Sequence, residues 1–316
     1  IRRGPLAQPE SATEVFDAEQ GGSSVADNAL GVTTGFPVDM FMHFDNYTSG
    51  GENFVVDRLR GSRAQVRTQY TNAEAFYSTN NPSLDSNTGL INRSGSTQNL
   101  SGGFYWSWKR APGFFDVVAY TGDSYPNRNV THNLTVKPEL VITKKRNSSG
   151  NWEVAAKITN TNYHGGLLNS SGYFFNISLN VSGNAYSQFS DNHFQVGGTL
   201  NSSGDDYISY LFATLPGVSK VGSYTGNGSS QTIDCGFTSG ARFVLIKRTD
   251  STSDWWVFDT ERGIVAGNDS LLSLNGNAAE DTSYDNIDPD SSGFIINNTA
   301  WNENASGGSY IFYAIA

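Results

Sequence analysis

The sequence predicts an all-β protein built from tandem β-sandwich repeats. Glycine is abundant at 34 residues, aromatic residues make up 13% of the 316-residue chain, and charged residues make up only 16%. This composition suits many short strands joined by tight turns better than long helices held by salt bridges. Short apolar and aromatic runs alternate with clusters of Gly, Asn, Asp and Ser, and no long segment has a helical apolar period.

Similar segments recur at a spacing of about 100 residues, the size of a β-sandwich domain. PGFFDVVAYTGD at 112–123 aligns with PGVSKVGSYTGN at 216–227. PELVITKKRNSSGNWEV at 138–154 aligns with ARFVLIKRTDSTSDWWV at 241–257, so that a tryptophan recurs at the same strand position. A unit of this length is too long for a solenoid repeat, and we expect a jelly-roll or lectin-like sandwich.

A third and more diverged copy precedes these two. DDYISYLFA at 205–213 matches GSYIFYAIA at 308–316, and GGFYWSWKR at 102–110 occupies the same place before its own Pro-Gly. We therefore expect three separate sandwiches arranged like beads on a string. Their expected bounds are 36–112, 113–216 and 217–316.

Two kinds of strand are expected within each repeat. FVLIKR at 243–248 is a short apolar run of the kind that is buried on both faces of a sheet. WWVFD at 255–259 and YIFYAIA at 310–316 are rich in aromatic and β-branched residues. Because side chains alternate along a strand, Trp255 and Trp256 must face opposite sides, and the repeated Trp255 is expected in a core.

The first 35 residues are expected to form an N-terminal arm. Ser11 lies three residues before Glu14, as in a capping box, and Gly21 is placed to end a helix of about two turns. Since an isolated helix of that length is marginal in water, we expect the arm to dock on a neighbouring chain or ring.

Charge and cysteine content exclude several classes of protein. The formal net charge of −10 argues against binding of DNA, RNA or an anionic membrane surface, because each needs a basic face. One cysteine, Cys235, cannot form a disulfide within the chain, and we expect a buried, inert thiol. No apolar stretch approaches the roughly 20 residues that span a bilayer, and the first residues lack the apolar segment of a signal peptide, so we expect a soluble protein.

DWWVFDTERG at 254–263 resembles an active site, since it holds aromatic, acidic and basic side chains together. NFVVDRLRG at 53–61 repeats its Asp-x-x-Arg-Gly pattern. The second repeat has AAKITN at 155–160 instead, and none of the four histidines lies near Asp259. We therefore interpret the pattern as a turn held by a carboxylate–guanidinium pair, with glycine at a positive φ, rather than as a catalytic site.

Other chemistry is weakly indicated. DPDSSG at 288–293 resembles the start of a calcium loop, but the late glutamate is missing and a turn before a strand explains it better. Glu74 and Glu280 are the obvious carboxylate pair for a glycosidase, yet they occupy matching positions in different repeats. Neither a catalytic residue, a metal site nor a cofactor is expected. Trp256 and Trp301 are the better candidates for contact with a glycan.

The repeated motifs resemble a family found in tailed bacteriophages, in tail fibre and other virion structural proteins. They are the Tyr-Thr-Gly opening at 120–122 and 224–226, the strand ending in lysine, the tryptophan after it, the Asp-x-x-Arg-Gly turn and the aromatic final strand. The resemblance runs from near Gly35 to the end, although the second repeat lacks the Asp-x-x-Arg-Gly turn and the first lacks Tyr-Thr-Gly. The family implies no enzymatic residues.

This resemblance implies a non-enzymatic virion structural protein of a tail fibre, spike or similar appendage. Its expected partners are other virion proteins and further copies of the chain, with a trimer as the first expectation, and a host surface glycan. A capsid decoration or head-fibre protein and a carbohydrate-binding module are the alternatives.

Overall fold

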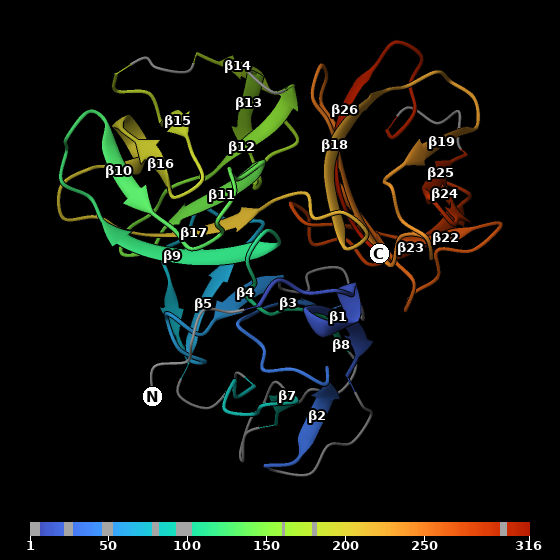
Figure 1. Cartoon of the computed structure of the whole chain (residues 1–316), viewed down its shortest axis with the longest axis horizontal. Helices are drawn as coiled ribbons and strands as arrows, with labels where there is room; N and C mark the ends of the chain where they lie inside the picture. Colours follow the sequence, from blue (N-terminus) through green and yellow to red (C-terminus); the bar gives the residue numbers. More distant parts are fainter. Residues whose placement is uncertain are drawn as a thin grey trace.

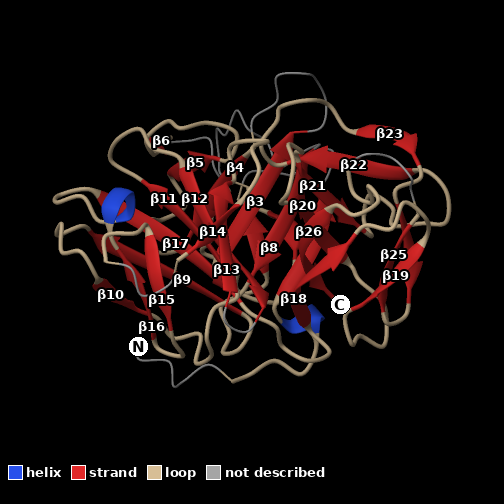
Figure 2. Cartoon of the chain, turned by 90° about the horizontal axis from the view of Figure 1, so that it is seen from above, coloured by secondary structure: helices blue, strands red, loops and turns tan. Residues whose placement is uncertain are grey.

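The computed structural model describes residues 7–21, 28–45, 53–77, 82–92, 103–159, 162–178, 182–297 and 302–316. Nearly all regular structure in these residues is antiparallel β-sheet, which confirms the all-β prediction (Figure 2). The two helical elements found there are short 3₁₀ turns, and none is long or apolar enough to cross a bilayer. Three lobes, one for each repeat, surround a common centre (Figure 1).

Each repeat contributes a similar series of strands. Repeat 1 contains η1 Ala12–Glu14, β1 Phe16–Gln20, β2 Leu30–Thr33, β3 Met40–Asp45, β4 Phe54–Asp57, β5 Ala64–Arg67, β6 Ala75–Phe76, β7 Gly89–Ile91 and β8 Gly103–Trp108. Repeat 2 contains β9 Phe115–Thr121, β10 Arg128–Thr131, β11 Leu140–Lys145, β12 Trp152–Thr159, β13 Asn162–Leu167, β14 Phe175–Ile177, β15 Tyr186–Phe189, β16 His193–Val196, η2 Gly198–Leu200 and β17 Asp206–Phe212. Repeat 3 contains β18 Ser219–Thr225, β19 Gln231–Asp234, β20 Phe243–Arg248, β21 Trp255–Asp259, β22 Asp269–Ser273, β23 Asp281–Tyr284, β24 Ile287–Asp290, β25 Gly293–Ile296 and β26 Ser309–Ile315.

Every repeat is a sandwich of a large sheet and a small one. The six-stranded sheets have the corresponding orders β1-β8-β3-β4-β5-β6, β9-β17-β11-β12-β13-β14 and β18-β26-β20-β21-β22-β23. The small sheets are β2-β7, β10-β16-β15 and β19-β25-β24. Their matching topology makes the chain a ring of three related sandwiches (Figure 1).

The strand registers relate the repeats residue by residue. The central strands of the three large sheets are β3, β11 and β20. Their first residues pair with Asp57 in repeat 1, Ala156 in repeat 2 and Asp259 in repeat 3. These three positions are therefore equivalent, and the same counting makes Trp152 equivalent to Trp255. The sequence alignment of the second and third repeats is confirmed by this register.

The central strands of the large sheets are buried on both faces. One face of the repeat 2 sheet packs against its own small sheet through side chains such as Val141 and Ala155. The opposite face points to the centre of the ring, where one cluster unites Trp106, Ile142 and Leu245 from the three repeats. The central strand β20 is consequently buried along almost its whole length, as its uninterrupted apolar run predicts.

The expectation of beads on a string is wrong, because the three repeats share this central cluster. Repetition in the sequence reports the repeated strands but not how the repeats pack against one another. An apolar residue inside a sandwich and one that faces a neighbouring repeat give the same pattern.

The predicted N-terminal helix is also wrong. Ser11 does accept a hydrogen bond from the Thr13 amide, at 3.3 Å, but the helical turn ends at Glu14. The following residues form β1 and pair with β8 along its length. Phe16 is fully buried against the rings of Trp108 and Phe243, at 5.1 and 5.3 Å, so burial in the centre of the ring outweighs the local helix signal.

A single repeat cut out of the ring should not fold by itself. A fragment of residues 113–216 would expose the central face of its large sheet, including Tyr210 and Phe212, to water. We expect it to aggregate or to give a poorly dispersed NMR spectrum, whereas the full chain unfolds in one cooperative transition. A soluble fragment with native-like chemical-shift dispersion would contradict the shared core.

Candidate functional site

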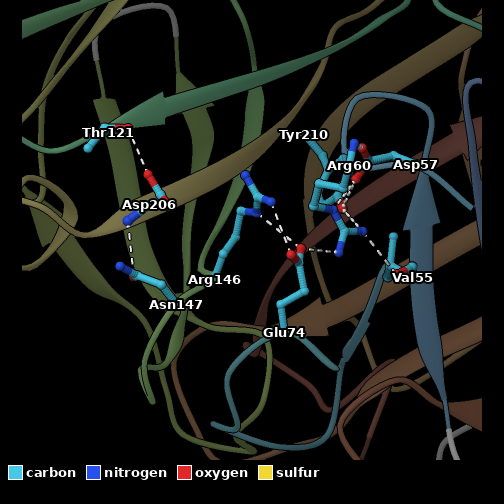
Figure 3. A network of polar contacts seen from close by, with 9 residues as sticks. All are labelled: Val55, Asp57, Arg60, Glu74, Thr121, Arg146, Asn147, Asp206 and Tyr210. Atoms are coloured by element: carbon cyan, nitrogen blue, oxygen red, sulfur yellow. Dashed lines mark hydrogen bonds and ion pairs between the residues drawn. The ribbon is translucent and has the colours of Figure 1, made fainter. Parts of the chain in front are cut away.

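The Asp-x-x-Arg-Gly pattern forms a buried corner. In repeat 1, Asp57 accepts hydrogen bonds from the Arg60 amide at 3.0 Å and from Arg60 Nε at 2.5 Å (Figure 3). The next residue, Gly61, has a φ of +85°. Repeat 3 builds the same corner, with Arg262 Nε 2.6 Å from an Asp259 oxygen. The interpretation of the pattern as a turn is confirmed.

These corners bind the next repeat around the ring. The Tyr210 hydroxyl of repeat 2 donates to Asp57 at 2.8 Å (Figure 3), and the Trp106 indole of repeat 1 donates to Asp259 at 2.8 Å. Tyr210 and Trp106 occupy equivalent positions on the last strand of their repeats. The same type of contact, a side-chain donor bound to a buried aspartate, therefore occurs between repeats 1 and 2 and between repeats 3 and 1.

Glu74 extends the network between repeats 1 and 2. It accepts from Arg60 of its own repeat at 3.0 Å and forms a two-pronged pair with Arg146 of repeat 2, at 3.0 Å for each contact (Figure 3). Arg60 is fully buried; burial lowers its pKa, but the neighbouring Asp57, Tyr210 and Glu74 outweigh that effect and the pKa rises. The guanidinium therefore stays charged and holds a folded corner together.

Repeat 2 lacks the buried aspartate and glutamate at its interface with repeat 3. Ala156 replaces the aspartate and lines a small cavity together with Tyr313, the equivalent of Tyr210. Phe174 takes the place of the glutamate and packs against the Trp255 ring at 5.6 Å. At the corner position, this interface is therefore apolar, whereas the corners of the other two interfaces are ionic.

A second contact closes the ring in all three interfaces. At one equivalent position of each repeat, a side-chain N–H donates to a backbone carbonyl of the preceding repeat: Trp152 Nε1 at 2.8 Å, Trp255 Nε1 at 2.9 Å and Asn53 Nδ2 at 3.3 Å. The acceptors are Arg67, Leu167 and Ser273. The repeated tryptophans Trp152 and Trp255 are thus buried core residues, as predicted, and they donate to equivalent carbonyls.

The other candidates from the sequence have structural contacts. Glu280 lies 3.3 Å from Arg262, as Glu74 lies beside Arg60, so both carboxylates of the suggested glycosidase pair are engaged within their corners. Residues 288–293 form the hairpin between β24 and β25, where Asp290 accepts from the Ser292 amide and hydroxyl. Within the described ranges, no three His, Cys, Asp or Glu residues are grouped as metal ligands.

The structure describes one of the two tryptophans that were predicted to contact a glycan. Trp256 is half-buried against the core and donates to the Ser253 hydroxyl at 3.2 Å. It faces the opposite side of the sheet from Trp255, as predicted. Trp301 lies outside the described residues.

The structure brings together two histidines that are far apart in the sequence. His132 and His193 meet at one end of the small sheet in repeat 2, where the Ser190 hydroxyl is 2.8 Å from His193 Nδ1. Ser190 also accepts from the His193 amide and donates to its carbonyl, and His132 Nε2 lies 3.2 Å from the Ser190 carbonyl. These contacts fix a tight turn, and only the pairing of β10 with β16 could have revealed them.

Glu303 is an ionisable group buried in repeat 3. Its pseudo-equivalent is Leu200, since Tyr120 donates to the Leu200 carbonyl as Tyr224 donates to the Glu303 carbonyl. The glutamate is 1% exposed, and burial raises the pKa of its carboxyl to about 8. The group is therefore largely neutral at pH 7.

Repeat 2 also contains the candidate binding pocket. A pocket of about 460 Å³ lies between its large and small sheets and is lined by residues that include Glu153, Phe175, Tyr186 and Thr199. A neighbouring pocket of about 240 Å³ shares Glu153 and Thr199 and adds Lys145 and Asn151. We call the two together the repeat 2 groove. The groove was not predicted from the sequence, because its signal is the absence of bulky residues at two positions of one repeat.

Residues 17–316 match the model of a domain family of unknown function, DUF7483, and the chain belongs to this family. The match starts within β1 and runs through all three repeats as one unit, which agrees with the shared core. No curated protein matches the chain, and no solved structure matches it.

The two ring interfaces can be compared with a matched pair of substitutions. Tyr210→Phe removes a donor from the buried Asp57 carboxylate, so we expect a loss of about 2 kcal/mol in unfolding free energy. Tyr313→Phe removes the equivalent hydroxyl at the interface where Ala156 takes the place of the carboxylate, and we expect a change within about 0.5 kcal/mol. Denaturant unfolding of both variants measures the difference; equal losses would contradict the role of the corner.

The buried Glu303 predicts a dependence of stability on pH. Its folded pKa is raised, so the folded state binds more protons than the unfolded state, and stability falls as the pH rises from about 4.5 through about 8. Glu303→Leu, which copies Leu200, should remove this loss and exceed the native protein by on the order of 4 kcal/mol above pH 8. Unfolding at pH 5 and pH 8.5 measures the effect, with the exposed Glu261→Gln as control. A gain that is equal at both pH values would contradict it.

Proposed function

We propose that this member of the DUF7483 family is a non-enzymatic structural protein of a tailed-bacteriophage virion. Its place is a tail fibre, spike or similar appendage that contacts the host surface. The observation that carries the proposal is that the acidic and basic side chains resembling an active site have structural roles. The Asp-x-x-Arg corners of repeats 1 and 3 are buried and hydrogen-bonded across repeat interfaces, so their chemistry stabilises the ring.

A ring that shares one core suits a particle that must survive outside a cell. Opening one repeat exposes apolar surface of the other two, because the central cluster contains side chains from all three. The net charge of −10 favours solubility of such a particle component. The resemblance of the repeated motifs to phage virion proteins is the second support.

A capsid decoration or head-fibre protein is the second candidate, and the ring itself favours it. A single chain with pseudo-threefold symmetry can sit over a threefold axis of a shell without forming a trimer, whereas a fibre is expected to trimerise. The two candidates therefore differ in the expected oligomeric state as well as in position on the particle.

Labelling of purified particles tests the proposal. Gold-labelled antibodies against the chain should mark the tail of the phage that encodes it, and mass spectrometry should find the chain in banded particles. Label on the head would favour the decoration protein, and light scattering of the purified chain would add its oligomeric state. Absence from particles that contain the known tail and head proteins would refute a virion role.

A further inference from the structure

Repeat 2 has an open groove at a place where the other two repeats carry bulky side chains. The position of Glu153 is held by Phe54 in repeat 1 and by Trp256 in repeat 3, according to the strand registers. Phe54 is buried and Trp256 is half-buried against the core, whereas Glu153 forms the wall between the two pockets of the groove. Repeat 2 thus has a carboxylate where the other two repeats have an aromatic side chain.

A second difference between the repeats lies on the same face of this sheet. Gly165 is equivalent to Gln65 in repeat 1 and to Leu271 in repeat 3, and both of those side chains are buried. A Cβ atom at Gly165 would lie 3.0 Å from the Phe175 ring, so a side chain there would crowd the groove. The absence of a side chain at Gly165 therefore makes room for the Phe175 ring, which lines the groove together with Glu153.

The lining of the groove is both aromatic and polar. Phe175 lines the larger pocket and is 57% exposed, so part of its ring is free to contact a ligand. Glu153 and Thr199 lie between the pockets, and Asn151 lines the smaller one. Burial raises the pKa of Glu153, while its hydrogen bond with Thr199 opposes the shift.

The charge of the groove limits the ligand that it accepts. Glu153 repels carboxylated or sulfated groups. Lys145, which lines the smaller pocket, is held by Asp205 at 2.7 Å and supplies little free positive charge. A purely apolar ligand would desolvate the carboxylate without offering it a donor. An uncharged molecule with many hydroxyl groups and an apolar face satisfies all three conditions.

We propose that the repeat 2 groove binds a neutral oligosaccharide of the host surface. One sugar ring lies against Phe175 and donates a hydroxyl hydrogen bond to Glu153, and the next sugar occupies the smaller pocket beside Asn151. This proposal rests on the proposed attachment role and moves the glycan contact from Trp256 and Trp301 to repeat 2. At the equivalent positions, repeat 1 carries Phe54 and Gln65 and repeat 3 carries Trp256 and Leu271, which are bulkier than Glu153 and Gly165 taken together.

Binding of the purified full chain to an array of neutral and acidic glycans tests the proposal, followed by titration calorimetry with the best neutral oligosaccharide. We expect Phe175→Ala and Glu153→Gln to weaken binding at least tenfold. Gly165→Leu, which copies repeat 3, should abolish it. The control is Asp281→Ala, at the position of repeat 3 that is equivalent to Phe175, and it should bind like the native chain. Thermal unfolding of each variant separates a lost contact from a lost fold.

Three results would overturn the proposal: retention of no glycan by the native chain, a preference for acidic glycans, or native affinity in Phe175→Ala and Glu153→Gln. The particle-labelling experiment is independent of all three. A chain that labels the virion but retains no glycan would refute the groove and leave the structural role standing. A chain that binds neutral glycans but is absent from particles would do the reverse.

Discussion

The structure depends on the side-chain donor that each repeat extends to a backbone carbonyl of the preceding one. Trp152, Trp255 and Asn53 occupy the same position in their repeats and connect all three interfaces in a closed cycle. Loss of the donor would leave a buried carbonyl without a hydrogen bond, which lowers the free energy of unfolding. The cycle therefore favours one register of each repeat against the next. The shared apolar cluster supplies the larger stabilisation but is not directional.

The two kinds of ring interface reach the same packing by different chemistry. Between repeats 1 and 2, the Asp57–Arg60 corner receives the Tyr210 hydroxyl, whereas between repeats 2 and 3 Ala156 and Phe174 leave an apolar contact. Buried ion pairs often contribute little net stability compared with apolar residues of similar volume. The corners of repeats 1 and 3 thus fix the geometry of their interfaces, and removal of one partner would leave a buried charge uncompensated.

Much of the fold could be predicted from the sequence, because repetition and strand patterns are local properties. The strand class, the correspondence of Trp152 with Trp255 and the corner role of Asp259 all follow from spacing. The closure into a ring could not be predicted, since an axis-facing Ile142 and a sandwich-facing Val141 are equally apolar. The prediction of a helix from Ser11 and Glu14 was wrong, because Phe16 is buried against Phe243, more than two hundred residues away in the sequence. The groove was missed for a related reason: a missing side chain such as that of Gly165 has meaning only beside its pseudo-equivalents.

Covalent linkage of the three sandwiches has a consequence for their divergence. In a homotrimer every substitution appears three times, so an interface or a pocket cannot change in one subunit alone. Within one chain, repeat 2 has exchanged its corner for Ala156 and Phe174 and has opened the space beside Glu153, while its neighbours keep the bulky side chains. A surface feature that belongs to one repeat is present once per molecule and points in one direction. Any gain in affinity from multivalent binding must then depend on the number and the spacing of the molecules displayed side by side.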